Sequence, residues 1–279
     1  MGIESIIKKN VPESDLSRLD QTIGNITAKR SVRDLYMAYS LLNKNFDRDK
    51  KVVCSDIDED LGAYLVQHRA NLLDLARIHL LSGVLRKDHD FFVDKVANII
   101  QVADTSELAT FLRYMILLPN AGDFKQTAVE ALRTNIAVLF DAIALNNPYP
   151  GKFFNDRQWN QMYLKAAFME RDLSQIQDVD LRANRELSRI ISDYAHERWA
   201  ASRKVDPLFW RPVAPFLDQA LLEDMQRLLE SDDVEENKAG ALCCHHSNNE
   251  RAMALLQGYP ALLEAIQRKE LTWNTVKTM

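Results

Sequence analysis

The segment "SDYAHERWAASR", residues 192–203, holds the side chains of this sequence that are best suited to chemistry. Asp193 and His196 are three residues apart, so a helix places them on one face. A histidine that is oriented by a carboxylate can serve as a general acid or base. A zinc-protease helix needs a second histidine at position 200, where this chain has Ala200, so that motif is absent.

The same segment also has a structural interpretation, as a polar frame that holds neighbouring helices in register. Acidic and basic residues follow one another from residue 182 to residue 197 at three- and four-residue steps, the spacing at which opposite charges pair along a helix. These residues are Arg182, Glu186, Arg189, Asp193 and Glu197. Both interpretations, the frame and the ligand-contacting helix, are kept.

Further polar and aromatic residues between 133 and 211 lie in otherwise apolar segments. Burying an amide or a charge without a partner costs about 2 kcal/mol or more, so these groups must pair with one another or with a ligand. Aromatic faces supply contact area to a bound molecule, and polar ends orient it. The candidate ligand-binding residues are Arg133, Asn135, Asn147, Tyr149, Trp159, Asn160, Gln161, Lys165, His196, Trp199, Arg203, Trp210 and Arg211. The alternative is a polar network that links helices through the "NNPYP" turn.

The "CCHH" segment at 243–246 has the residue types of a metal site but not the spacing. Consecutive residues of a helix point about 100° apart, so Cys243 and Cys244 cannot easily reach one ion. Only Cys243 and His246 share a face, and no second pair of ligands is evident. We therefore assign neither a metal nor a cofactor, and expect buried cysteines.

Composition indicates that helices must position these residues. The 279 residues include only eight glycines and eight prolines, which favours long helices over the turn-rich sequence of a sandwich or barrel. The net charge of -5, with both signs interleaved, excludes the basic field that nucleic-acid binding requires. No run of about 18 apolar residues occurs, so we expect no transmembrane helix. An odd number of cysteines, three, suits a reducing compartment and predicts a cytoplasmic location.

Helix-capping and helix-breaking residues along the chain predict the helices around the candidate residues. We expect a loop over residues 44–60, a helix capped by Thr105 or Ser106, and a second helix from Phe124 to Ile143. Asn155 and Gln158 form a capping box, which starts a helix with Asn160, Gln161 and Lys165 on its polar side. A helix then covers about 183–203, and prolines break up the segment after it at Pro207, Pro212 and Pro215. The region 231–266 has the succession of short helix, turn and helix that is typical of α-solenoids.

Several segments, taken in order, resemble the EboA family of bacterial ebo operons. They are "EALRTNI", "NNPYP", "WNQMYLKAAF", "DLRANREL", "YAHERWAASRKVDPLFWR" and the terminal "LTW". The resemblance is clear over about 120–275 and loose over the first hundred residues. Two segments depart from it: Asp178-Val179 stands where we expect Gly-Leu, and "CCHH" replaces small apolar residues.

This resemblance implies a helical protein of metabolite traffic, whose operon also encodes a prenyltransferase-like membrane protein and hydrolase- and isomerase-like enzymes. It supplies a pathway, the delivery of a small-molecule precursor toward the cell envelope, and no reaction. We expect one all-α domain over 1–279, built of stacked antiparallel helix pairs as an irregular HEAT-like solenoid without a strict repeat. Two lobes, 1–120 and 121–279, are the alternative.

The leading hypothesis for function is a cytoplasmic adaptor that binds a small aromatic or prenylated metabolite, or another protein of the ebo operon. One alternative is an enzyme in which His196 is the acid or base, Asp193 orients it, and Lys165 or Arg203 stabilises negative charge. The other is a scaffold whose concave face holds a partner protein.

Overall fold

The computed structural model describes residues 3–54 and 59–277, and within these the chain is all-helical. Helices account for 72% of it, with 17 α-helices and no strand in the described ranges, which confirms the all-α class. Contacts divide the chain into two compact units, Met1–Phe153 and Phe154–Met279, called here the N-terminal unit and the C-terminal unit. No helix in the described ranges has the length and apolar character needed to cross a bilayer.

The N-terminal unit contains eleven of the α-helices, with three short 3-10 helices between them. The α-helices are α1 (Ile3–Asn10), α2 (Glu13–Lys29), α3 (Val32–Leu41), α4 (Glu59–Gln67), α5 (Leu72–Lys87), α6 (His89–Ala97), α7 (Ile99–Val102), α8 (Thr105–Tyr114), α9 (Lys125–Ala131), α10 (Ala137–Ala144) and α11 (Tyr149–Phe153). The 3-10 helices are η1 (Leu42–Lys44), η2 (Met115–Leu117) and η3 (Ala121–Phe124).

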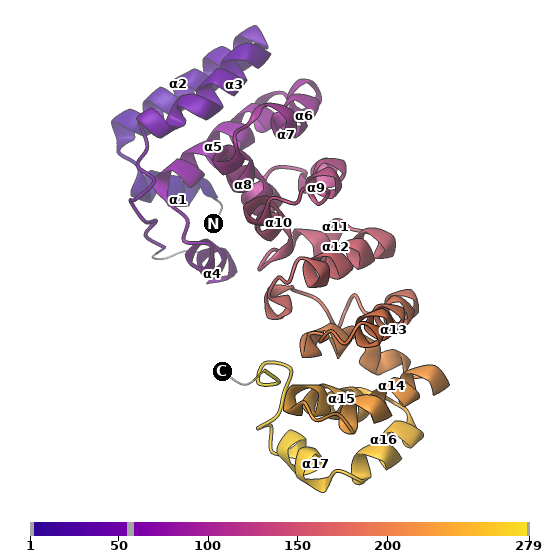
Figure 1. The fold of residues 1–279 in the computed structure, drawn as a ribbon. Helices are drawn as coiled ribbons and strands as arrows, with labels where there is room; N and C mark the ends of the chain where they lie inside the picture. Colours follow the sequence, from indigo (N-terminus) through magenta and orange to yellow (C-terminus); the bar gives the residue numbers. More distant parts are fainter. Residues whose placement is uncertain (1–2, 55–58, 278–279) are drawn as a thin grey trace. The chain divides into compact units, whose positions relative to one another are not determined.

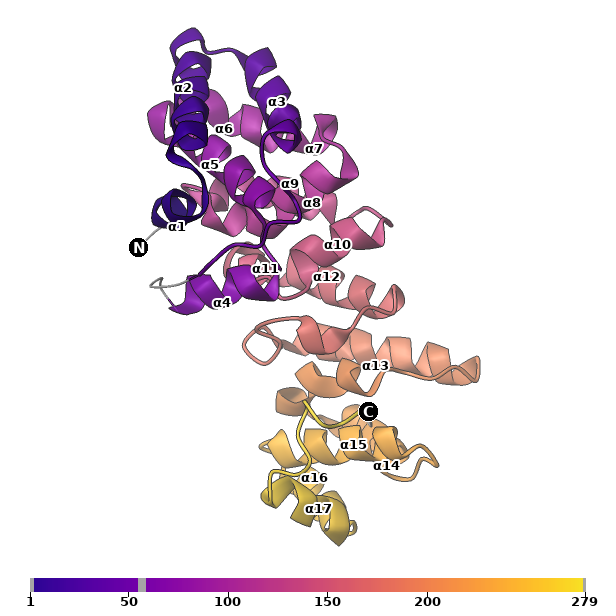
Figure 2. The same ribbon diagram turned by 90° about the vertical axis from the view of Figure 1, so that its left-hand side faces the viewer.

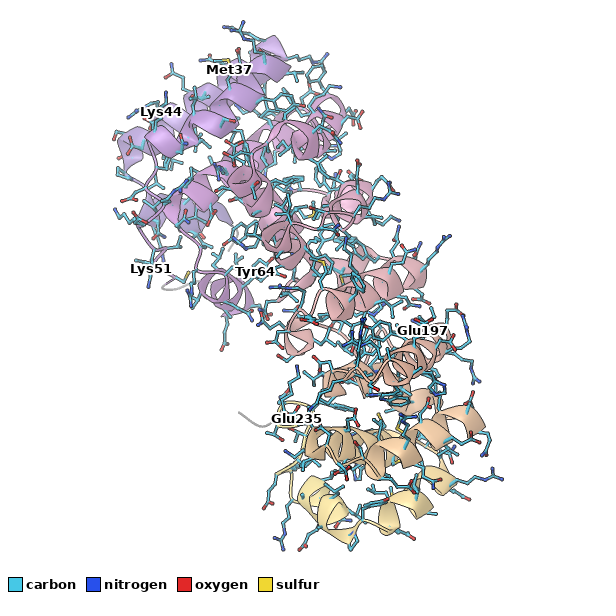
Figure 3. All side chains as sticks on the ribbon, viewed as in Figure 1. Met37, Lys44, Lys51, Tyr64, Glu197 and Glu235 are labelled. Carbon is cyan, nitrogen blue, oxygen red and sulfur yellow. The ribbon has the colours of Figure 1, made fainter. Side chains whose placement is uncertain are left out.

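Helix α5 is the centre of the N-terminal unit. A capping box between Asn71 and Asp74 starts it, and nearly all of its side chains are buried. It contacts α1, α2, α6 and α8, so neighbours surround it (Figures 1 and 2). Tyr64 reaches from α4 toward α8, where its hydroxyl donates to the Arg113 carbonyl, whereas Met37 on α3 points to solvent (Figure 3).

A set of buried charged and polar side chains, called here the closed network, lies within this core. Arg77 on α5 is 2% exposed, and its guanidinium lies 3.7 Å from the Glu107 carboxylate of α8 and 3.3 Å from the Thr110 hydroxyl. Thr110 in turn donates to Asp74 at 2.8 Å. The Tyr39 ring lies 5.3 Å from the same guanidinium, and burial raises the pKa of its hydroxyl. Arg77 Nε is buried without a hydrogen-bond partner, whereas the other contacts of the network link α3, α5 and α8.

Residues 45–54 form no helix, as expected for the charged segment. The expectation extended over 55–58, which lie outside the described residues, and over Glu59 and Asp60, where α4 already begins. The cap of α8 also differs from the expectation, because the Asp104 carboxylate accepts from the Glu107 amide and the Glu107 carboxylate accepts from the Asp104 amide. This capping box lies one residue before the predicted cap, Thr105 or Ser106.

The single helix expected from Phe124 to Ile143 is wrong. Helix α9 ends at Ala131, and α10 begins only at Ala137. Between them the Thr134 hydroxyl accepts from the Ile136 amide at 3.0 Å, and Ile136 is extended. A threonine that satisfies a nearby amide gives the backbone an alternative to the helical hydrogen bond, so the helix is interrupted.

The C-terminal unit contains the remaining six α-helices. They are α12 (Asp156–Phe168), α13 (Arg185–Ala200), α14 (Gln219–Leu229), α15 (Val234–His246), α16 (Glu250–Gln257) and α17 (Pro260–Gln267). Two 3-10 helices, η4 (Leu173–Gln175) and η5 (Pro207–Phe216), join them. The prolines at 207, 212 and 215 were predicted to break up the segment after α13, and they lie within the largely buried 3-10 helix η5.

Helix α15 is central to the C-terminal unit, where it contacts η5, α14, α16 and α17 (Figure 1). Gly240 allows the closest approach, since a Cβ atom there would lie 2.9 Å from Leu228 Cβ and 3.3 Å from Met225 O. Cys243 and Cys244 follow on the same helix and are fully buried, as expected. Helix α14 is therefore fixed against α15 along its apolar face.

Candidate functional site

Four of the predicted binding residues belong to the N-terminal unit. Arg133 and Asn135 are exposed, and Asn147 and Tyr149 are buried. The Asn147 amide donates to the Ala142 carbonyl at 2.9 Å and its oxygen accepts from the Tyr149 amide, while the Tyr149 hydroxyl donates to Ala121 at 2.7 Å. These bonds hold the "NNPYP" turn in place, and a ligand contact at this turn stays a prediction.

The other predicted residues belong to the C-terminal unit, and on α12 they are distributed between core and surface. Trp159 is 1% exposed and Gln161 is exposed. Asn160 was expected on the polar side, but it is 4% exposed and exchanges two amide hydrogen bonds with Asn184, at 3.1 and 2.8 Å. Lys165 is half-buried, and this burial lowers the pKa of its amine.

Two arginines fasten the loop before α13 to its surroundings. Arg182 lies 5.3 Å from the Trp159 ring and pairs with Asp156 at 3.1 Å. Arg211 donates two bonds to the Asp180 carboxylate at 2.8 and 2.6 Å, which raises the pKa of the guanidinium. A paired and partly buried arginine of this kind holds a loop in position.

Helix α13 carries the Asp193–His196 pair, but these residues do not contact each other through a hydrogen bond. Asp193 accepts from Arg189 at 2.8 Å, and Arg189 also reaches Glu186 at 3.2 Å, as the charge spacing predicts. His196 Nε2 lies 2.5 Å from Oδ1 of Asp224, on α14. The other oxygen of Asp224 accepts from the Ser192 hydroxyl at 2.5 Å. The carboxylate that orients His196 is therefore Asp224.

Three side chains gather around Trp199 at the end of α13. Its ring stacks on Trp210 with centroids 5.6 Å apart and planes at 20°. The guanidinium of Arg227, from α14, lies 4.2 Å from the same ring, and the His196 ring lies 5.5 Å away. Trp210 is fully buried, whereas Trp199 is half-buried, so Trp199 connects the core to the surface.

Two neighbouring hollows share this surface, with volumes of about 900 and 510 Å³. Trp199, Arg227, Ser231, Asp232 and Glu236 line both. The larger hollow is also lined by Ser202, Arg203, Lys204, Asp233, Val234 and Glu235. Of the thirteen residues predicted to bind a ligand, the structure places Trp199 and Arg203 at the edge of this larger hollow.

Charges of both signs surround the larger hollow, and the carboxylates are partly occupied. Asp233 pairs with Lys204 at 2.7 Å, which raises the pKa of the amine and lowers that of the carboxyl. Glu236 accepts from the Ser231 hydroxyl at 2.5 Å. Arg203 and Arg227 have no carboxylate partner among the described residues, so both guanidiniums can receive a bound group.

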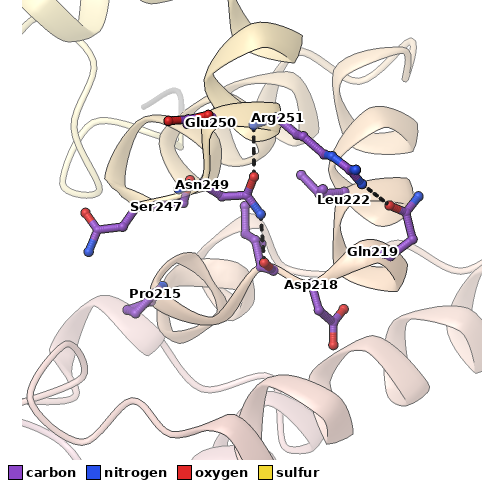
Figure 4. Close-up of a pocket in the computed structure, with 10 residues that line it drawn as sticks. Pro215, Asp218, Gln219, Leu222, Ser247, Asn249, Glu250 and Arg251 are labelled. Atoms are coloured by element: carbon purple, nitrogen blue, oxygen red, sulfur yellow. Dashed lines mark hydrogen bonds between the residues drawn. The ribbon is translucent and has the colours of Figure 1, made fainter.

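A separate hollow of about 500 Å³ lies where α14 and α16 begin (Figure 4). Three hydrogen bonds join some of the polar groups drawn there. Arg251 donates to the Gln219 side chain at 3.0 Å, and the Asn249 amide donates to the Leu217 carbonyl at 2.9 Å. The Asn249 oxygen accepts from the Arg251 amide. This hollow contains no sequence-predicted residue, and we assign it no ligand.

The cysteine and histidine segment packs into the C-terminal core. Cys243 Sγ donates to the Trp210 carbonyl at 3.3 Å, and His246 contacts the Leu242 carbonyl within its own helix. Burial raises the pKa of the Cys243 thiol and raises that of Cys244 to about 12. Within the described ranges no three His, Cys, Asp or Glu side chains are grouped to hold a metal ion.

Comparison with known protein families matches residues 2–214 to the family described as "Metabolite traffic protein EboA". The chain belongs to the EboA family. The match confirms the family that the short sequence segments indicated. Its extent differs from the expected 120–275, because the match includes the first hundred residues and ends within η5. No curated protein and no solved structure matches the chain.

One departure from the expected EboA pattern has a structural counterpart. Asp178 replaces the expected glycine and has a φ of 59°, the left-handed conformation that glycine adopts at little cost. Aspartate tolerates this region better than most residues. The loop before α13 therefore keeps a conformation suited to glycine although the residue is different.

Sequence reasoning missed the two α14 residues that complete the Trp199 cluster, Asp224 and Arg227. Asp224 had a detectable signal, because it lies on the apolar face of α14 with Leu221, Met225 and Leu228. A carboxylate on such a face must find donors. Arg227 gave no comparable signal, since it is one of many exposed arginines.

Proposed function

We propose that this EboA-family chain binds a small aromatic or prenylated metabolite during metabolite traffic, at the larger hollow beside Trp199. The observation that carries the proposal is the contact between Trp199 and Arg227, 4.2 Å apart, in the lining of a hollow of about 900 Å³. The family description, a metabolite traffic protein, supports a small molecule as cargo.

The chemistry of the lining suits such a ligand. Small-molecule sites commonly have volumes of about 300–1,000 Å³ and combine aromatic surface with a few polar groups. Here Trp199 supplies aromatic surface, and Arg203 and Arg227 supply hydrogen-bond donors without carboxylate partners in the described ranges. The ligand is therefore expected to combine a ring or isoprenoid body with an oxygen-bearing end.

The buried members of the predicted site have a supporting role in this proposal. Trp210 lies under Trp199, and Asn160 holds the cap residue of α13, Asn184. Arg211 fastens the preceding loop to Asp180. The polar frame and the ligand-contacting helix are thus two parts of one arrangement.

A fluorescence titration tests the proposal, because Trp199 is one of only four tryptophans. The purified protein is titrated with 3-phenylpropionate and with geraniol, and we expect a saturable change in emission. Trp199→Phe should remove the change, whereas Trp273→Phe, a half-buried tryptophan near the end of the chain, should keep it. An unchanged signal with both probes and with cell extracts, together with no co-purified small molecule, would rule out the metabolite-binding function.

The cytoplasmic location and the arrangement of the helices are parts of the same proposal. We infer that the helices stack as antiparallel pairs in an irregular solenoid, which would present extended surfaces for cargo or partner proteins. Free thiols at Cys54, Cys243 and Cys244 support a reducing compartment. Fractionation of cells and labelling of the thiols in intact cells test the location.

An enzyme is the second candidate, favoured by the contact between His196 and the buried Asp224 at 2.5 Å. A carboxylate that fixes the orientation of a histidine is typical of general acid–base sites. Turnover of pathway intermediates by the wild type, lost in His196→Gln with binding retained, would support it. Binding without turnover would favour the carrier.

A protein scaffold is the third candidate, favoured by Phe168 and Leu181, which are 75% and 83% exposed. Exposed apolar side chains can mark a docking surface. Pull-down of operon proteins with the wild type and with Phe168→Ser tests this version.

A further inference from the structure

A further hollow of the C-terminal unit, called here the helix-start hollow, lies between the first half of α13 and the start of α14 and has a volume of about 540 Å³. It shares no lining residue with the larger hollow beside Trp199. Part of its lining is apolar, because half-buried Phe216 and Leu221, which is 5% exposed, both face it. This volume and an apolar lining are typical of small-molecule sites.

Three of the charged side chains around the helix-start hollow pair with one another. Arg189 lies 2.8 Å from the Asp193 carboxylate and 3.2 Å from the Glu186 carboxylate. All three residues belong to α13, at the spacing that lets opposite charges meet along one helix. These groups therefore have partners in their own helix and do not need a ligand.

Two other charges, one of each sign, have no ion-pair partner within the described residues. They are Arg185, the first residue of α13, and Asp218, the cap residue of α14. One oxygen of Asp218 accepts from the Leu221 amide at 3.1 Å, and the other accepts no hydrogen bond in the described ranges. Both side chains line the same hollow and form no ion pair with each other, so a ligand that carries both charges can pair with both.

The Ser192 hydroxyl adds an uncharged acceptor to the same lining. Its hydrogen is directed to the buried Asp224 carboxylate, 2.5 Å away, so its oxygen keeps lone pairs for another donor. The acceptors that remain without a donor are therefore Ser192 and Asp218, while the donor that remains without an acceptor is Arg185. An ammonium group and a carboxylate on one ligand match this set.

We propose that the helix-start hollow is a second small-molecule site, which binds an α-amino acid with an apolar side chain. The carboxylate of the ligand pairs with Arg185, its ammonium group pairs with Asp218, and its side chain packs on Phe216 and Leu221. The site is separate from the larger hollow, so this inference does not rest on the proposed function.

An NMR titration tests the ligand class, because the backbone amide signal of Leu221 reports the helix-start hollow and that of Trp199 reports the larger hollow. The ligands are L-phenylalanine, 3-phenylpropionate, which lacks the ammonium group, and phenethylamine, which lacks the carboxylate. At Leu221, L-phenylalanine should bind about fivefold more tightly than either analogue, the ratio that one exposed ion pair gives. Equal affinities, or no shift of the Leu221 signal, would overturn the inference and leave the proposed function standing.

Variants then test the two ion pairs. Arg185→Gln should lower the affinity for L-phenylalanine about fivefold and leave that for phenethylamine unchanged. Asp218→Asn removes the charge but keeps a good helix cap, and it should abolish the preference for L-phenylalanine over 3-phenylpropionate. Arg198→Gln is the matched control, because Arg198 lies on the same helix outside the lining of this hollow, and it should keep both preferences. Preferences that survive in Arg185→Gln or Asp218→Asn would overturn the assigned ion pairs.

Discussion

In the N-terminal unit the buried charges pair with one another, whereas in the C-terminal unit the buried carboxylate pairs with a side chain that reaches solvent. Arg77, Glu107 and Asp74 are each less than 8% exposed and form a closed set with Thr110. Asp224 is equally buried, but its partner His196 is 62% exposed on its side chain.

The difference separates a structural network from a candidate site. The charged members of the closed network are all buried away from solvent, so we expect them to act on stability. In the Asp224–His196 pair, a buried carboxylate holds an exposed side chain in one orientation. Binding sites with fixed geometry use side chains that are held in this way. The types of polar residue in the sequence did not distinguish the buried network from the Asp224–His196 pair. The two differ in whether the partner of the buried carboxylate is itself buried or exposed.

The largest expected effect comes from opening the closed network. Arg77→Met leaves the buried Glu107 carboxylate without its cation, so we expect a loss of about 3–5 kcal/mol in the free energy of unfolding. Urea unfolding measures the loss. The control is Arg33→Met, an exposed arginine, which should change the stability little. A loss at Arg77 as small as that of the control would show that this network does not stabilise the unit.

The second effect compares the helix packing of the two units at glycine. In Gly240→Ala the new methyl group would meet Leu228 and Met225, so we expect a loss of about 1–3 kcal/mol. In Gly24→Ala, on α2, the nearest atom is the end of Lys87 at 3.7 Å, so the better helix propensity of alanine should stabilise by about 0.5–1 kcal/mol. Opposite signs in thermal unfolding are expected, and equal signs would contradict the close approach of α14 and α15.

The third effect comes from removing the Asp224 carboxylate, which contacts Ser192 and His196. Asp224→Ala deletes the acceptor of Ser192 and His196, and we expect a loss of about 1–2 kcal/mol, because exposed His196 can turn to water. This loss should be smaller than that of Arg77→Met. A loss as large as that of Arg77→Met would place Asp224 with the closed network and weaken the contrast between the units.

The smallest effect concerns thiol reactivity and leaves stability unchanged. Thiolates react and neutral thiols do not, and burial raises the pKa of Cys243 and raises that of Cys244 to about 12. Half-buried Cys54 should therefore be labelled first by a maleimide near neutral pH, and labelling of the other two should require denaturant. Mass spectrometry of timed samples checks this order. Early labelling of Cys243 would mean that the C-terminal core opens easily.

Helix starts were predictable where the signal was local. The capping box of Asn155 and Gln158 is present as predicted, with bonds of 2.9 and 3.0 Å. The interruption between α9 and α10 was missed, because the apolar pattern of residues 124–143 favours one continuous helix. That pattern gives no sign of the hydrogen bond from the Ile136 amide to the Thr134 hydroxyl. The prolines after Pro207 were predicted to break up the segment, since proline ends α-helices, and the segment forms a 3-10 helix that contains them.

The candidate site was predictable only in part, for a different reason. His196 and Trp199 stood out by type, but their partners Asp224 and Arg227 are 28 residues away on another helix. Spacing within one helix suggested Asp193 as the partner, and only the packing of α14 against α13 shows the true one. Local patterns can single out a candidate histidine, but three-dimensional contacts are needed to assign the carboxylate that orients it.

Gly240 links the interior of the C-terminal unit to its surface chemistry. One side of α14 is seated on that glycine through Leu228, and the same helix carries Asp224 and Arg227 toward Trp199. A sideways movement of α14 would therefore displace the carboxylate and the guanidinium together. We therefore expect a substitution at residue 240 to change the positions of Asp224 and Arg227 as well as the stability of the unit.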